Sequence, residues 1–139
     1  MTDASSKPKA PALNGGIVPY LTVDGVAEAI DFYVRAFGAT EVGERALMED
    51  GRRAMNARIE INGNSLMLMD PMPEHGHPWV APAGFNLHLH VDDADRWFAR
   101  AVEAGCTVVM PVALQFWGDR YGSVKDRFGV HWGIGSTPA

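Results

Sequence analysis

The chain has 139 residues, of which 47% are hydrophobic and 21% charged, as is typical of a globular protein with one core. Its net charge of −5, from 12 basic and 17 acidic residues, disfavours a nucleic-acid partner, which requires a concentrated basic surface. No apolar run approaches the roughly 20 residues that cross a bilayer, and the first residues lack the apolar segment of a signal peptide. We therefore expect no membrane partner and a cytoplasmic location.

The first half of the chain predicts a strand followed by an amphipathic helix. Residues 1–14 read as a disordered tail, and Gly16–Val23 alternates as a strand does. A helix then follows, with Asp24 as its expected cap and Gly38 as its stop. Its apolar stripe consists of Val26, Ile30, Tyr33 and Phe37.

Three strands are predicted to complete this first module. They cover Thr40–Met48, Met55–Ile61 and Ser65–Met69, and Asn62-Gly63 between the last two is a strong hairpin signal. The module thus reads β-α-β-β-β over about residues 15–70. Residues 71–84 are rich in proline and read as a linker.

The second half repeats the same order of elements, over residues 85–136. Phe85–Val91 alternates as a strand, and a helix opens after Asp92-Asp93 and stops at Gly105. The buried stripe of this helix is predicted to be Ala94, Trp97, Phe98, Ala101 and Val102. The last strands are predicted at Thr107–Met110, Gly122–Lys125 and Val130–Gly135. Neither copy can bury its apolar face alone, so the repeat predicts one α+β domain over residues 15–136, with a core or cleft shared by two modules.

Several motifs resemble a known family. They are Val18-Pro19-Tyr20-Leu21, Ala29-Ile30-Asp31-Phe32-Tyr33, Phe116-Trp117-Gly118-Asp119-Arg120-Tyr121-Gly122 and Asp126-Arg127-Phe128-Gly129-Val130-His131-Trp132. On these residues the chain resembles the vicinal oxygen chelate (VOC) superfamily of glyoxalase and bleomycin-resistance proteins, and within it the PhnB-like branch. The resemblance implies tandem β-α-β-β-β modules whose curved mixed sheets form a cleft, and it implies a homodimer.

Enzymes of that superfamily use a divalent metal held by His, Glu or Gln on the first and last strands of each module. The corresponding positions here are Val18, Met67, Asn86 and Gly133. Of these four residues, only the Asn86 amide offers even a weak donor to a divalent cation. We therefore expect neither the superfamily's metal site nor any other cofactor.

Strand alternation indicates which polar side chains line the cleft instead. Asn86, His88 and His90 share one face of their strand, and His131 shares the face of Gly133. Three interpretations of the histidines remain open at this point. They are a displaced metal site formed by His88, His90 and His131, polar lining residues bonded to neighbours or water, or neutral groups that recognise or protonate a ligand.

Aromatic residues favour the binding of a small molecule. Phe116, Trp117 and Tyr121 are expected in an irregular connection that closes over the cleft, and Met67 adds an adaptable floor. The favoured function is metal-independent binding of an antibiotic-like or aromatic ligand. The expected ligand-binding residues are Tyr20, Met67, Asn86, His88, His90, Trp117, Tyr121 and His131.

Two enzymatic alternatives stand beside this hypothesis. One is a metal-dependent glyoxalase-like lyase or dioxygenase that uses His88, His90 and His131, and the other is a metal-free isomerase with a histidine base. Elemental analysis of the purified protein separates the first alternative from the binding protein. The sequence names neither the ligand nor the subunit that completes the cleft.

Overall fold

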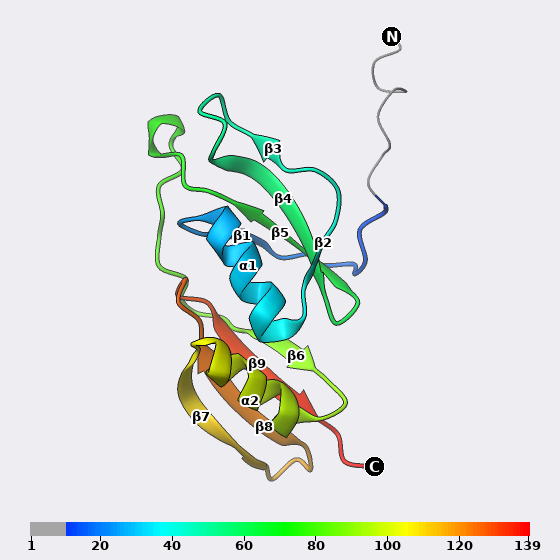
Figure 1. The fold of residues 1–139 in the computed structure, drawn as a ribbon. Helices are drawn as coiled ribbons and strands as arrows, with labels where there is room; N and C mark the ends of the chain where they lie inside the picture. Colours follow the sequence, from blue (N-terminus) through cyan, green and yellow to red (C-terminus); the bar gives the residue numbers. More distant parts are fainter. Residues whose placement is uncertain (1–10) are drawn as a thin grey trace.

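The computed structural model describes residues 11–139 as two sheets with one helix on each (Figure 1). The first module contains β1 (Tyr20–Thr22), α1 (Val26–Phe37), β2 (Thr40–Glu41), β3 (Ala46–Leu47), β4 (Ala54–Ile61) and β5 (Asn64–Met69). The second contains β6 (Leu87–His90), α2 (Ala94–Ala104), β7 (Thr107–Leu114), β8 (Arg120–Lys125) and β9 (His131–Ser136). A short 3-10 helix, Pro73–His75, interrupts the connection between the modules. The predicted α+β class and tandem repeat are confirmed.

Each module pairs its strands in the same way. Sheet one has the order β1-β5-β4-β2, with β3 also on β4, and sheet two has the order β6-β9-β8-β7. In both sheets the first strand lies at an edge and runs parallel to the last strand of its module. The remaining pairs are antiparallel. Figure 1 shows both sheets as open and curved rather than closed into a barrel.

The apolar stripe of α1 is buried as predicted, and Gly38 ends the helix in a left-handed conformation with φ of 67°. The predicted cap at the other end is wrong. Asp70, which follows β5, accepts hydrogen bonds at Oδ1 from the backbone N–H groups of Gly25 (2.9 Å) and Val26 (3.0 Å). The carboxylate that accepts from the N–H groups at the helix start is thus distant in the chain, so the local sequence did not reveal it.

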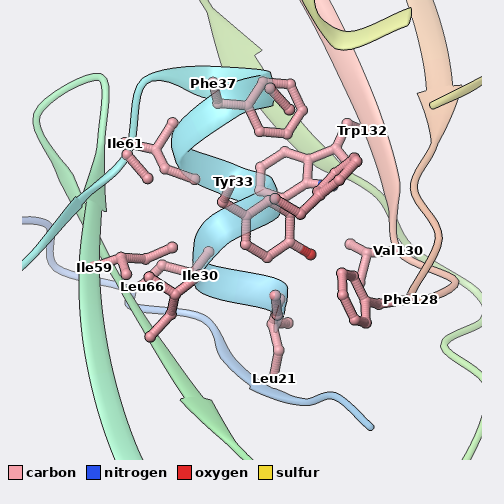
Figure 2. Packing of buried hydrophobic residues seen from close by; sticks show 14 of the residues in the cluster. Leu21, Ile30, Tyr33, Phe37, Ile59, Ile61, Leu66, Phe128, Val130 and Trp132 are labelled. Carbon is pink, nitrogen blue, oxygen red and sulfur yellow. The ribbon is translucent and has the colours of Figure 1, made fainter. Parts of the chain in front are cut away.

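The core joins the two modules around the rings of α1 (Figure 2). The Tyr33 ring lies 5.6 Å from that of Trp132 and 6.1 Å from that of Phe128, while Phe37 lies 4.7 Å from Trp132. The Tyr33 hydroxyl donates to the buried carboxylate of Asp126 over 2.6 Å. Residues of module one thus bury the apolar side of module two, as the repeat predicted.

Some element boundaries differ from the prediction. The strand expected over Thr40–Met48 is divided into β2 and β3, and β7 extends to Leu114. Tyr121 lies in β8, not in the irregular connection. In α2 the side chain of Val102 is exposed, because the helix buries mainly Ala94 and Ala101. Of the predicted tail, residues 1–10 lie outside the described residues.

Candidate functional site

The face of sheet one that α1 leaves uncovered carries Tyr20 and Met67. Along β4, the residues Ala57, Ile59 and Ile61 are buried, so the intervening side chains point to this open face. Tyr20 is 47% exposed and pairs with Met67 across the parallel strands. Its hydroxyl accepts a hydrogen bond from the Asn56 amide over 3.1 Å, and that amide also lies 3.6 Å from the Met67 sulfur. Together, Tyr20, Asn56 and Met67 form a small amphipathic cluster.

The open face of sheet two gathers most of the predicted site. The rings of His88 and Tyr121 are stacked at 5.7 Å with an interplanar angle of 12°. The Trp117 ring lies 5.9 Å from Tyr121, and the Asn86 amide approaches the Tyr121 hydroxyl at 3.4 Å. His90 lies next to His88, with ring centroids 5.4 Å apart. We call these five residues the aromatic-imidazole cluster: Asn86, His88, His90, Trp117 and Tyr121.

Two glycines of β9 give this cluster its space. In the register of sheet two, Gly133 lies beside His88, and Gly135 lies between His90 and Tyr121. A Cβ atom on Gly133 would fall 2.5 Å from the Tyr121 hydroxyl oxygen, and one on Gly135 would fall 3.0 Å from Cε1 of His88. Tyr121 therefore occupies the space above Gly133, where the family resemblance implies a metal ligand.

The two histidines of β6 form a hydrogen-bonded chain. Nε2 of His88 lies 3.2 Å from Nδ1 of His90, and Nε2 of His90 lies 2.9 Å from Oγ1 of Thr137. Partial burial, and then the charge of His90, lower the pKa of His88 from its ordinary value of 6.5, while Asp119 acts in the opposite direction. The neutral form of His88 is therefore favoured at neutral pH.

His131 lies on the same face, towards the other end of β9. Trp132 is buried, so by alternation His131 shares the open side with Gly133. Together with Phe85, Asn86 and Ser123 it lines a concavity of about 570 Å³. Asn86 is thus common to this concavity and to the aromatic-imidazole cluster. Phe85 is predicted to begin this strand, but β6 begins only at Leu87 and Phe85 is 52% exposed.

The donor set does not fit the superfamily's divalent metal site. The four corresponding positions hold an alkyl group, a thioether, an amide and no side chain, at Val18, Met67, Asn86 and Gly133 respectively. Among residues 11–139, no three His, Cys, Asp or Glu side chains are grouped so that they could hold a metal ion.

Other parts of the site could not be read from the sequence. Thr137 and Gly135 belong to it only through contacts with His90 and His88 of a strand distant in the chain. The spacing of His88 and His90 indicated the pair, but nothing in the sequence indicated Thr137 as its partner. A separate concavity of about 660 Å³, lined by Arg52, Trp79 and Arg127 among others, lies at the start of α1 and contains none of the predicted site residues.

Comparisons with known proteins agree with this fold. The uncharacterized protein Rv0887c of Mycobacterium tuberculosis is 46% identical over 123 residues, which cover 84% of this chain and 71% of the relative. The crystal structure of protein PA1353 from Pseudomonas aeruginosa superposes with a TM-score of 0.70 at 29% identity, covering 87% of this chain and 96% of that one. A PhnB protein from Bacillus cereus shares the fold, with a TM-score of 0.66, 20% identity, and coverage of 88% and 100%.

A sequence model of one family matches residues 16–134, which include both modules. Within residues 11–139, no helix has the length and apolar character needed to cross a membrane. The shared core, the repeated strand pairing and this match lead to one assignment. The chain belongs to the Glyoxalase/Bleomycin resistance protein/Dioxygenase superfamily.

Proposed function

We propose that the protein binds a small, partly aromatic molecule without a metal. The observation that carries the proposal is the stack of His88 on Tyr121, with the Trp117 ring tilted by 60° against Tyr121, on an open sheet face. Aromatic walls with a few polar groups are the usual composition of a small-molecule site. Trp117 is 50% exposed, so its ring is free to contact a ligand, while Asn86 and His90 are placed to orient the ligand's polar groups.

The proposal includes a homodimer in the cytoplasm. Tyr20 and Met67 lie on sheet one, whereas Asn86, His88 and the other expected ligand-binding residues belong to the second module. A second copy that places its sheet-one face over the sheet-two face of the first would bring both sets to one ligand. The exposed aromatic side chains on both faces support such an arrangement. The buried, unpaired thiol of Cys106 is consistent with a reducing compartment.

Binding is tested with metal-stripped, full-length protein and a nitroaromatic probe, 4-nitroanisole, followed by the chemical shifts of the backbone amides. We expect shifts in β6, β8 and the loop that contains Trp117, and we expect Trp117→Ala to weaken binding about tenfold, since a stacked aromatic pair and its buried area are lost. The matched control is Trp79→Ala, because Trp79 is 44% exposed in the connection between the modules. Equal losses in the two variants would contradict the site.

Two further measurements address the rest of the proposal. Light scattering after gel filtration should report twice the chain mass, and a monomer in the presence of the probe would contradict the dimer. Elemental analysis separates the alternative, a metal-dependent lyase or dioxygenase. If untagged protein contained stoichiometric metal that was lost on His88→Ala or His131→Ala, metal-independent binding would be wrong.

A further inference from the structure

The hydrogen-bonded chain on sheet two connects the ligand face to solvent. His88 stacks on Tyr121 inside the aromatic-imidazole cluster, and Thr137 is exposed just beyond the end of β9. His90 lies between them and bonds to both, at 3.2 Å and 2.9 Å. Within residues 11–139, Nδ1 of His88 has no hydrogen-bond partner. That atom is therefore available to a ligand.

Only two arrangements of protons make both hydrogen bonds of this chain when both imidazoles are neutral. A neutral imidazole carries one N–H donor and one bare nitrogen, and a hydroxyl can donate or accept. If Thr137 accepts from Nε2–H of His90, then His88 donates through Nε2–H and its Nδ1 is bare. If Thr137 donates instead, His90 donates to His88, and Nδ1 of His88 carries the proton. Each arrangement converts into the other when every proton moves one step along the chain.

We infer that His88, His90 and Thr137 form a proton relay that accepts one proton from the hydroxyl of a phenol-like or enol-like ligand and releases one proton to water. The inference rests on the proposed function, because the ligand must first occupy the aromatic-imidazole cluster. It adds a ligand class, an aromatic or unsaturated molecule with a weakly acidic O–H. His88 contacts the ligand, and His90 and Thr137 are positioning residues.

The proton balance closes without a metal or another reactant. The ligand O–H bond breaks as an N–H bond forms at Nδ1 of His88, which leaves an oxyanion beside an imidazolium. The Nε2 proton of His88 then moves to Nδ1 of His90, and the Nε2 proton of His90 moves to Oγ1 of Thr137. The hydroxyl proton that Thr137 held passes to water. Both imidazoles end neutral, so the chain never holds two positive charges on adjacent rings.

The geometry of the stack holds His88, the first proton acceptor, in place. Tyr121 covers one side of the His88 ring, and the absence of a side chain at Gly135 leaves room for Cε1 of that ring. The ring is thereby fixed with Nε2 towards His90. A proton acceptor requires an imidazole that is held in one orientation with one ring nitrogen free for the ligand.

The test compares two probes that differ in one proton, 4-nitrophenol and its methyl ether 4-nitroanisole. Binding of each is followed by amide chemical shifts, and the protonation state of bound 4-nitrophenol by its absorption, at a pH below the pKa of the free phenol. We expect binding to raise the phenolate fraction, and we expect the phenol to bind about tenfold more tightly than the ether, since a bond to a charged group is gained.

Variants separate the relay from a merely structural role. Thr137→Val should remove the preference for the phenol, leave the affinity for 4-nitroanisole unchanged, and alter the nitrogen chemical shifts that report the His88 tautomer. Thr107→Val is the matched control, an exposed threonine on the edge strand β7.

Each outcome decides between the two proposals. Equal affinity for both probes, or an undiminished phenol preference in Thr137→Val, would overturn the relay and leave the binding function intact. If neither probe binds, both proposals are overturned.

Discussion

Gly133 sets how closely Tyr121 can lie against His88. A Cβ atom at this position would meet the Tyr121 hydroxyl oxygen at 2.5 Å, far inside normal contact, so the ring would have to move. Because the ring of Tyr121 covers His88, its position also controls the solvation of that imidazole. Gly133 thus links the packing of Tyr121 on β8 to the pKa of His88 on β6.

We expect Gly133→Ala to raise the pKa of His88 towards 6.5 and to cost about 1–3 kcal/mol of stability through overpacking. In the native protein the pKa lies below 6.5, mainly because of burial, so the unfolded chain binds that proton more tightly. The contribution of His88 to stability is therefore present above 6.5 and is lost as the pH falls through the lower, folded-state pKa. The proton resonances of His88, followed across that pH range, measure the shift.

The control for this substitution is Gly16→Ala. Nothing lies within 4 Å of a Cβ atom at Gly16, so the pKa of His88 should not change. An unchanged His88 titration in Gly133→Ala would show that Tyr121 does not shield the imidazole.

At the scale of elements, the start of each helix donates a backbone hydrogen bond to a side chain at the end of its own sheet. Asp70 follows β5 and bonds to the start of α1, and Ser136 at the end of β9 accepts from the backbone N–H of Ala94 over 3.1 Å. Asp70 also accepts at Oδ2 from the N–H of Ala54 over 2.8 Å. The repeat thus extends to how each helix is fastened to its sheet, although aspartate serves in one module and serine in the other.

We expect Asp70→Ala to destabilise the protein by about 2 kcal/mol or more, because it removes the helix cap and leaves three backbone N–H groups without their acceptor. Asp24→Ala is the control, since Asp24 is exposed and makes no hydrogen bond within residues 11–139. Urea unfolding gives both values. If the loss at Asp24 matched that at Asp70, the helix would be capped locally after all.

This pair of aspartates also shows what the sequence can predict about elements. Periodicity identified α1 and its buried stripe, and the dipeptide Asn62-Gly63 identified the hairpin, because those features depend on neighbours in the chain. The cap is provided by a residue distant in the chain. The division of one predicted strand into β2 and β3 also depends on distant residues, because the two strands pair separately with β4. The same limit applies to the site. Alternation identified His88 and His90, but Thr137 joins them only through the fold.

At the scale of the whole molecule, the two modules are joined through charge and hydrogen bonding as well as apolar packing. Arg100 of α2 donates to the carbonyl oxygens of Arg35 (2.8 Å) and Val34 (3.2 Å) at the end of α1. In the core, Asp126 accepts at Oδ2 from the Tyr33 hydroxyl and from the indole N–H of Trp132 (2.9 Å). Burial, followed by the charge of Asp126, raises the pKa of Tyr33 well above its ordinary value, so this hydroxyl stays a donor.

Since Tyr33 is fully buried and its partner belongs to the other module, we expect Tyr33→Phe to weaken both modules together. The loss should be about 1–3 kcal/mol, because a bond to a buried carboxylate is removed while the ring and its contacts remain. Amide exchange should show equal losses of protection in β4 and β8, whereas Tyr20→Phe, which removes an exposed hydroxyl bonded to the Met55 carbonyl oxygen, should change little. Protection lost in β8 alone would mean that the modules unfold separately. The open faces of the two sheets would then not be held in fixed relation by the core.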